Sequence, residues 1–275
     1  FVNDESVTFS GAIVINGILN LHGGNIVGNS SMYGGAFLVS TDAIFNMYGG
    51  CITGNLASER GGAGYLHKAS TVNIFGGSIS HNNAARGGAL YSGSNCKINI
   101  SDGCIADNTA TYAGAIYINN ESSCKMTAGK ITGNSADNSG GAFYIREGST
   151  LTLAGGNISD NTAGICGSAV YTDDMCKLEL EGCTISDNTS ATDGGTVFIH
   201  GNSSITIKSG SIMGNYGSAL ILDDSSTGTM SDGDIAQNTA ENGGGIFLRK
   251  NSSFDFSGGR IVTNTANAGG GIYVS

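Results

Sequence analysis

The residues of this chain that could do chemistry are its aspartates, several of which return at matching places in a repeating pattern. Three directly precede an asparagine and four more form two adjacent pairs: Asp107, Asp160, Asp187, Asp173-Asp174 and Asp223-Asp224. Clustered carboxylate oxygens can bind calcium, and carboxyl groups can act as acid and base on a polysaccharide. Asp160 and Asp187 are one repeat apart, so they are the calcium candidates. Solvated turn carboxylates are the favoured interpretation of these aspartates.

A catalytic site also needs a base or a cation beside these carboxylates, and the repeat pattern does not supply one. Lysine and arginine together number only 12, and we find none that stands reliably beside the aspartates. The four histidines share no repeat position except His67 and His200, which lie five repeats apart. The sequence therefore predicts no catalytic pair, no cofactor and no metal other than at the calcium candidates.

A repeat of 26 or 27 residues positions all of these side chains. Nine times in succession, 20 residues separate the second residue of a glycine pair, or its serine replacement, from an asparagine: Gly35 to Asn55, Gly62 to Asn82, Gly88 to Asn108, Gly114 to Asn134, Gly141 to Asn161, Ser168 to Asn188, Gly195 to Asn215, Ser218 to Asn238 and Gly244 to Asn264. Such a constant interval is typical of a solenoid of stacked coils.

Each repeat contains three short runs in which apolar and polar residues alternate, as they do in β-strands. In the repeat from Gly141 to Asn161 these runs are 142–145, 151–153 and 157–159. The chain is therefore predicted to be all-β, a right-handed single-stranded parallel β-helix of about ten coils with three strands per coil. One solenoid would cover 1–275 with a degenerate first coil at 1–29, and we expect it to be a piece of a longer protein.

The asparagine of the repeat never changes to Asp, Ser or Gly. An exposed left-handed corner would accept those residues, whereas a stacked amide must donate to one neighbour and accept from the other. We therefore predict a structural asparagine ladder at one corner of the coils, made of Asn29, Asn55, Asn82, Asn108, Asn134, Asn161, Asn188, Asn215, Asn238 and Asn264.

Aromatic residues recur in the strand that follows the glycine pair, on the parity opposite to its predicted core residues. They would form a stripe along one outer face of the rod: Tyr65, Tyr91, Tyr117, Tyr144, Tyr171 and Phe198. Stacked rings on neighbouring strands stabilise each other by about 0.5–1.5 kcal/mol per pair, which is one explanation of the stripe. The other is a binding surface for a sugar chain, another rod or a covering domain.

Coil length varies only between the asparagine and the next glycine pair. The segments LASER, SADNS and TAENG fill this place in three repeats, and we interpret them as variable loops in which recognition residues could lie. After Asn215 only Tyr216 remains before Gly217. This shortening predicts a notch beside Tyr216, which is a further candidate binding residue.

The seven cysteines are predicted to be mostly free residues that fill the core or the corners. Cys51 and Cys104 share a repeat position but lie two coils apart, about 9.6 Å by strand spacing, which exceeds the reach of a disulfide. Free thiols in a surface protein would suit a weakly oxidising, anaerobic habitat.

The composition limits the kinds of molecule that the chain could bind. A net charge of −10 would repel nucleic acid, and no apolar run is long enough to span a membrane. No proline and 46 glycines fit tight corners between strands that all donate backbone N–H groups.

Two motifs alternate along the chain. The first reads GGAFLV, GGAGYL, GGALYS and GGAFYI, beginning at Gly34, Gly61, Gly87 and Gly140, and the second reads ITGN, ISHN, ITGN and ISDN, beginning at Ile52, Ile79, Ile131 and Ile158. This alternation resembles the repeats of polymorphic outer-membrane proteins and of bacterial and archaeal adhesin-like β-helix proteins. The resemblance implies a passenger-like segment displayed on a cell surface and used for attachment.

We therefore expect a non-enzymatic extracellular or cell-surface rod, an adhesin or structural spacer that binds glycans or proteins along its side or associates with itself. Two alternatives use the same scaffold. One is a polysaccharide lyase or hydrolase with Asp160 and Asp187 as its catalytic residues. The other is a depolymerase similar to phage tailspikes, which would be a trimer.

Overall fold

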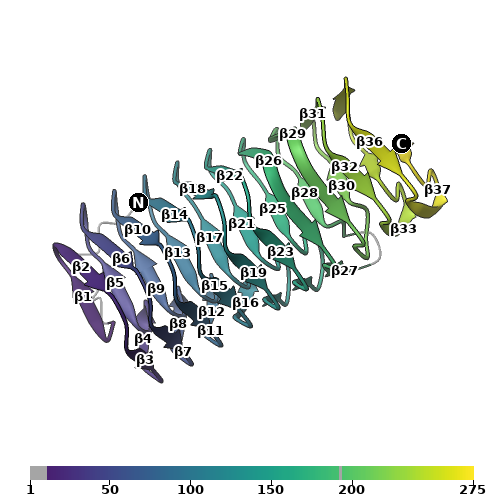
Figure 1. Cartoon of the computed structure of the whole chain (residues 1–275). Coiled ribbons are helices and arrows are strands. Elements are labelled where there is room, and N and C mark those ends of the chain that lie inside the picture. The colour runs from purple at the N-terminus through teal and green to yellow at the C-terminus, as the bar shows by residue number, and fades with distance from the viewer. Residues whose placement is uncertain (1–10, 192–193) are drawn as a thin grey trace.

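The computed structural model describes residues 11–191 and 194–275 and consists of parallel strands stacked into a rod. Successive coils follow one another along its axis from the N-terminal to the C-terminal end (Figure 1). The predicted right-handed parallel β-helix is confirmed. Its strands form three sheets, which we name A, B and C in the order in which each coil visits them. The start of the predicted first coil, residues 1–10, lies outside the described residues.

Sheet A contains one strand per coil, directly after the glycine pair. Its strands are β1 (Ile13–Ile15), β5 (Phe37–Val39), β9 (Gly64–Leu66), β13 (Leu90–Ser92), β17 (Ile116–Ile118), β21 (Phe143–Ile145), β25 (Val170–Thr172), β28 (Val197–Ile199), β30 (Leu220–Leu222), β34 (Ile246–Leu248) and β38 (Ile272–Val274).

Sheet B contains two short strands in most coils. The first is β2 (Ile18–Leu21), β6 (Ile44–Met47), β10 (Thr71–Ile74), β14 (Lys97–Ile100), β18 (Ser123–Met126), β22 (Thr150–Leu153), β31 (Thr227–Met230) or β35 (Ser253–Phe256). The second is β3 (Asn25–Val27), β7 (Cys51–Thr53), β11 (Ser78–Ser80), β15 (Cys104–Ala106), β19 (Lys130–Thr132), β23 (Asn157–Ser159), β32 (Asp234–Ala236) or β36 (Arg260–Val262). In two coils they merge into β26 (Lys177–Ser186) and β29 (Ser204–Met213).

Sheet C corrects the sequence interpretation. The segments after each asparagine, expected to be variable loops, form parallel strands in nine coils: β4 (Ser30–Tyr33), β8 (Leu56–Arg60), β12 (Asn83–Arg86), β16 (Thr109–Tyr112), β20 (Ser135–Ala136), β24 (Thr162–Ala163), β27 (Thr189–Ser190), β33 (Thr239–Asn242) and β37 (Thr265–Ala268). A buried alanine row on their inner side could have revealed them: Ala57, Ala84, Ala110, Ala136 and Ala163. The second and third predicted strands both belong to sheet B.

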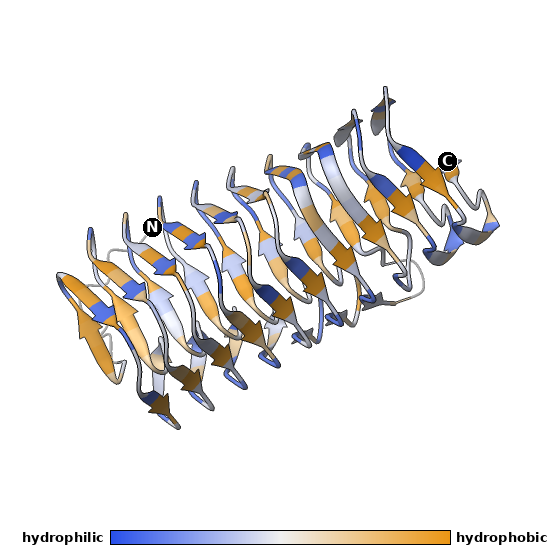
Figure 2. Ribbon diagram, viewed as in Figure 1, coloured by the Kyte–Doolittle hydropathy of each residue, from blue (hydrophilic) through white to orange (hydrophobic). Residues whose placement is uncertain are grey.

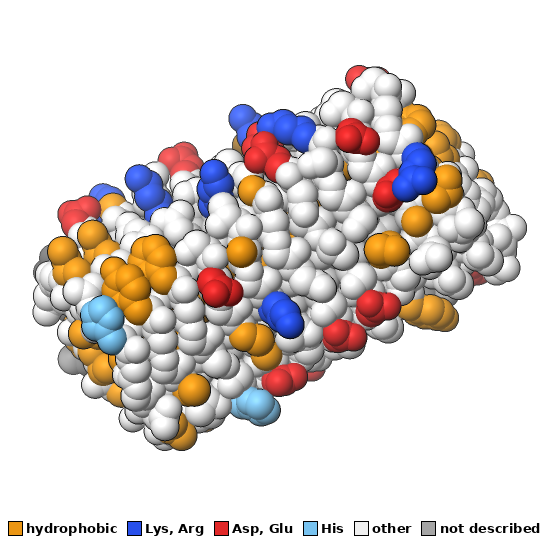
Figure 3. Space-filling model, viewed as in Figure 1, with side chains coloured by type: hydrophobic (Ala, Val, Ile, Leu, Met, Phe, Trp, Pro, Cys, Tyr) orange, Lys and Arg blue, Asp and Glu red, His pale blue; other side chains and the backbone are white. Residues whose placement is uncertain are grey.

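The core is a continuous column of apolar side chains in register between coils. Ile79 pairs with Ile105 and Ile105 with Ile131, and all three are buried. The inward residues of sheet A, such as Phe37, Leu90 and Phe143, belong to the same core. Figure 2 shows the apolar residues repeating from coil to coil, and Figure 3 shows charged side chains scattered over a largely uncharged surface.

The asparagine ladder lies at the corner between sheets B and C, as predicted. In each interior step the backbone N–H and the side-chain Nδ2 of one asparagine donate to Oδ1 of the next, as Asn108 does to Asn134 at 3.0 and 2.9 Å. Asn134 Nδ2 also donates to the carbonyl oxygens of Ile105 and Thr132 and to Asn161 Oδ1, at 3.0, 3.1 and 3.0 Å. Both amide hydrogens and the amide oxygen are therefore satisfied inside the rod.

The corner between sheets A and B holds a second buried row, made of serines and cysteines. The N–H of Cys96 donates to Ser122 Oγ at 2.9 Å, and the N–H of Cys176 donates to Ser203 Oγ at 3.0 Å. All seven cysteines are free, as predicted, and five of them are buried. Cys51 is exposed, and Cys104 is half-buried.

The glycine pair makes the turn from sheet C to sheet A. Its first residue adopts positive φ, +68° at Gly61 and +67° at Gly87. A Cβ atom on the second residue, Gly62, would collide with the carbonyl oxygen of Gly88 in the next coil. The pair is therefore a packing requirement of the stacked corner.

Candidate functional site on the outer face of sheet A

The outer side chains of sheet A form the predicted aromatic row, with one ring per coil. Ring centroids lie 5.6 Å apart for Tyr65 and Tyr91, 5.0 Å for Tyr91 and Tyr117, and 4.9 Å for Tyr117 and Tyr144. The row continues through Tyr171, 4.7 Å from Tyr144, to Phe198, 5.5 Å from Tyr171. The parity of the strand was therefore predicted correctly.

The expected exposure of this row is wrong for most of its rings. Tyr65, Tyr91, Tyr117, Tyr144 and Phe198 are all buried, with at most 9% of any one accessible, and only Tyr171 is half-buried. Neighbouring rings cover each other's faces, and side chains from the ends of sheet C strands lie against them. The Arg60 guanidinium is 5.1 Å from the Tyr91 ring centroid, and Tyr112 meets Tyr144 edge to face at 5.6 Å. Self-stabilisation is therefore the better interpretation of the row.

Burial extends the pH range in which the phenols of the row stay neutral into alkaline conditions. It raises the pKa of Tyr65 to about 12, although the Arg60 guanidinium acts in the opposite direction. Burial likewise raises the pKa of Tyr117, Tyr144 and Tyr171. The row is thus an apolar support at physiological pH, on which other side chains of sheet A are held.

A polar row runs beside the rings, because every second residue of a strand faces the same side. Two residues after each aromatic position stand His67, Gly93, Asn119, Arg146, Asp173, His200, Asp223 and Arg249. From Arg146 to Arg249 this row brings opposite charges from successive coils together.

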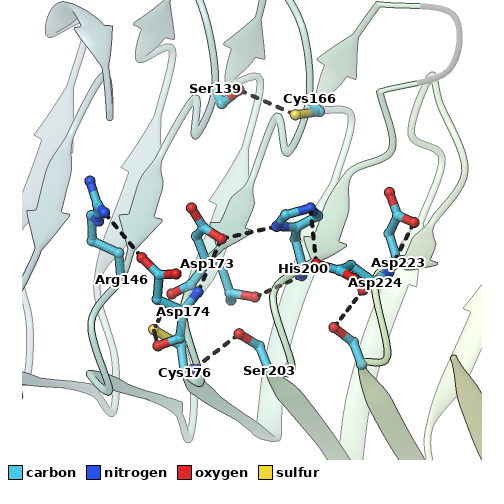
Figure 4. A network of polar contacts seen from close by, with 12 residues as sticks. Ser139, Arg146, Cys166, Asp173, Asp174, Cys176, His200, Ser203, Asp223 and Asp224 are labelled. Carbon is cyan, nitrogen blue, oxygen red and sulfur yellow. Dashed lines mark hydrogen bonds and ion pairs between the residues drawn. The ribbon is translucent and has the colours of Figure 1, made fainter. Parts of the chain in front are cut away.

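His200 lies at the centre of the resulting cluster (Figure 4). Its Nδ1 is 2.9 Å from Asp173 Oδ1, and its Nε2 is 3.9 Å from Asp224 Oδ2. The imidazole also lies near the aromatic row, with its centroid 6.4 Å from that of Tyr171. Two carboxylates and a half-buried ring therefore surround one imidazole.

Arginines close the cluster at both ends. Arg146 Nη2 donates to Asp174 Oδ2 at 3.0 Å. Arg249 Nη2 donates to Asp223 Oδ2 at 2.9 Å, and Lys250 Nζ approaches the same oxygen at 3.4 Å. The Asp223 side chain is only 4% exposed, so these contacts supply the charge and hydrogen bonds that a buried carboxylate needs.

This cluster corrects the expectation that no basic residue stands beside the aspartates. The pairs Asp173-Asp174 and Asp223-Asp224 were noticed, but their partners come from neighbouring coils and were missed. Aligning the repeats at the second residue after the aromatic would have shown Arg146, Asp173, His200, Asp223 and Arg249 in one column. Such a cluster can accept hydrogen bonds from sugar hydroxyls, and an imidazole oriented by a carboxylate can also transfer a proton.

Asp160 and Asp187 lie elsewhere, at exposed corners just before the asparagine ladder. They lie at equivalent positions of adjacent coils, as predicted, because Ser159 pairs with Ser186. Both adopt φ of 57°, the conformation that Gly133 and Gly214 adopt at the same corner in other coils. No group of three metal-ligating side chains forms among the described residues. Their geometry fits turn carboxylates, so neither a calcium site nor a catalytic pair is supported.

Tyr216 is exposed and borders the notch that the shortened coil predicts. Its backbone forms single bridges with Thr189 and Thr239, where sheet C is interrupted. A hollow of about 220 Å³ is lined by Tyr216, Thr239, Ala240, Glu241 and Asn267. Ligand binding at Tyr216 stays a prediction.

Comparison with known proteins identifies one family. The model of the right-handed β-helix region matches residues 114–275, which include the whole cluster around His200. No curated protein and no solved structure gives a significant match. In the part of the chain that the structure describes, no helix has the length and apolar character needed to cross a membrane.

Proposed function

The chain belongs to the right-handed β-helix family, and we propose that it is a non-enzymatic extracellular or cell-surface rod, an adhesin that binds a glycan on the outer face of sheet A. The binding site is the part of the polar row around His200, where Tyr171 emerges from the buried aromatic row. The ladders inside the rod support the proposal, because they hold this face rigid and present successive polar groups at the spacing of the coils.

The observation that carries this proposal is the set of polar contacts around His200. Asp174 contacts the Arg146 guanidinium at 3.0 Å and Asp173 contacts His200 Nδ1 at 2.9 Å, each partner coming from another coil. Carboxylate groups that are held in place in this way are suited to accepting hydrogen bonds from the hydroxyl groups of a sugar, which supports binding.

A glycan array followed by calorimetry tests the proposal. His200→Ala should weaken binding of the best glycan by about tenfold, equivalent to about 1.4 kcal/mol. His67→Ala is the matched control, because His67 occupies the same position in the polar row five coils away. Equal loss in both variants, or none in His200→Ala, would remove the site from the proposal. Binding to proteins but to no glycan would replace the glycan with a protein partner.

A second candidate function is a carbohydrate-active enzyme with His200 as its general base. The contact of 2.9 Å between His200 Nδ1 and Asp173 favours it, because a carboxylate in this place orients an imidazole for proton transfer. The same array glycans, incubated with the protein, decide between the two functions. Release of reducing ends or unsaturated sugars that stops in His200→Ala would establish the enzyme.

A further inference from the structure

Sheet B carries a second aromatic stack, which is exposed and was not singled out by the sequence. His22, Tyr48 and Phe75 follow the first sheet B strand in three successive coils. Their centroids are 4.8 Å apart at both steps, with interplanar angles of 7° and 13°. Tyr48 is 46% exposed and Phe75 45%, and neither belongs to the core. Aromatic rings that contribute nothing to the core and remain exposed mark a candidate binding surface.

A short row of asparagines runs parallel to this stack, two residues earlier in each strand. We call it the outer amide row, made of Asn20, Asn46, Asn73 and Asn99. Each Nδ2 donates to Oδ1 of the preceding coil at 2.8 Å, from Asn46 to Asn20, Asn73 to Asn46 and Asn99 to Asn73. Rings and amides together form one face of four coils.

Both rows end at the same step of the rod. The position after Phe75 is occupied by Ser101, whose Oγ contacts the Ile74 carbonyl oxygen at 3.3 Å. No ring continues the stack at this position, and Phe75 is 45% exposed. The position after Asn99 is Lys125, so the amide row ends at Asn99. The last ring of the stack and the last amide of the row thus lie in adjacent coils of the same sheet.

Lys125 supplies an unpaired positive charge at this step. Lys97, Lys125 and Lys130 are exposed, and none contacts a carboxylate within ion-pair distance in the described parts of the chain. Asp102, Asp107 and Glu121 lie near Lys97 and Lys130 in the sequence pattern, whereas the register neighbours of Lys125 are the uncharged Asn99 and Thr152. An ammonium group without a carboxylate beside it favours an anionic ligand.

We propose that this step is a second glycan site, separate from sheet A, which takes a sugar chain carrying carboxylate groups. The apolar C–H face of one sugar ring packs on the exposed part of Phe75 and extends the stack by one member. A sugar hydroxyl donates to Asn99 Oδ1, and the neighbouring carboxylate is held by Lys125, with Lys97 on the adjacent coil. The inference shares with the proposed function only the premise that the rod binds glycans.

Calorimetric titration of the full chain with a hyaluronan oligosaccharide tests the site, with a chitin oligosaccharide of equal length as the neutral probe. Hyaluronan should bind more tightly than chitin. Phe75→Ala should weaken hyaluronan binding by about tenfold, and Lys125→Gln by several fold in a way that added salt abolishes. Lys177→Gln is the matched control, because Lys177 stands in the row of Lys97 three coils further along and should leave binding unchanged.

The outcomes separate this inference from the site on sheet A. Binding that survives Phe75→Ala but fails in His200→Ala overturns the sheet B site and leaves the proposed function intact. Equal losses in Lys125→Gln and Lys177→Gln mean general attraction of a polyanion and overturn the site as well. Failure of the wild-type chain to bind hyaluronan also overturns it. A melting temperature that stays constant in Phe75→Ala shows that any lost affinity comes from the site.

Discussion

The molecule contains two asparagine rows, and they differ in length and in burial. The buried ladder keeps asparagine in all ten coils, whereas the outer amide row ends after Asn99 and continues as Lys125, Thr152 and Glu179. Both are joined by amide hydrogen bonds of 2.8 to 3.0 Å. The difference lies in solvent: water can replace a lost partner outside the rod but not inside it. A buried position in the ladder therefore requires asparagine, whereas an exposed position in the outer amide row can hold other residue types.

The two aromatic stacks differ in the same way. The positions of the buried row remain apolar after Phe198, as Ile221, Phe247 and Tyr273, and they pack in one cluster with Cys166 while the Arg249 guanidinium lies over the rings of Phe198 and Phe247. The exposed stack lasts for three coils and then gives way to Ser101. A row that supports the rod must continue along it, whereas a row that binds a ligand can be local.

Substituting one asparagine in each row should give the largest contrast. In Asn134→Asp, a carboxylate oxygen replaces Nδ2 and faces three acceptors, the carbonyl oxygens of Ile105 and Thr132 and Asn161 Oδ1. An uncompensated buried charge should lower the free energy of unfolding by about 4 kcal/mol. Asn73→Asp, in the outer amide row, should cost less than about 1 kcal/mol because water reaches it. Urea unfolding of both variants measures the difference, and equal effects would contradict the role given to burial.

Removing one ring from each stack should give the next largest contrast. Tyr117→Ala deletes a buried ring between Tyr91 and Tyr144 and should destabilise the rod by about 3 kcal/mol. Phe75→Ala deletes an exposed ring and should cost about 1 kcal/mol or less. Thermal and urea unfolding check both values. If Tyr117→Ala were as stable as the wild type, the buried row would not be needed for stability, and a binding role would again be the better explanation of it.

Alkaline pH should weaken the buried aromatic row. The folded pKa of Tyr65 is raised to about 12, above the ordinary value of 10. Its neutral form therefore contributes stability that is complete below pH 10 and is lost as the pH rises from 10 towards 12, by about 2 kcal/mol. Urea unfolding between pH 9 and pH 12, the range set by these two pKa values, measures the loss. Tyr65→Phe should lose less stability over the same pH range. If it lost as much as the wild type, the ionisation of other groups would be the cause of the loss.

Thiol labelling of the unmodified protein should distinguish buried from exposed cysteines by their reactivity. Burial raises the pKa of Cys124 and of Cys183 to about 12, so both are unreactive thiols in the folded rod. Cys51 is exposed and should react first with iodoacetamide at neutral pH, whereas Cys124 and Cys183 should react only in denaturant. Mass spectrometry of peptides identifies the modified residues. Rapid labelling of Cys124 in the native protein would show that the core opens.

Much of the fold could be predicted from the sequence, but the candidate site could not. The asparagine and aromatic rows repeat in the sequence itself, so their register and parity followed from counting. Sheet C was missed because strands such as Leu56–Arg60 are mostly polar, and their buried residue is only an alanine. The cluster around His200 was missed because its members differ from coil to coil, and a search for identical residues at one position overlooks Arg146, Asp173 and His200.

The sequence by itself determined the solenoid, its register and its inner rows, because period-two alternation and a constant interval leave one way to stack identical coils. Only the tertiary structure decided which outer rows are buried and which charges meet. Those outcomes depend on side chains that reach across coils and between sheets, as Arg60 does over Tyr91 and His200 does to Asp173. Such contacts join residues that are distant in the chain and follow no repeat, so they exist only once the coils have stacked.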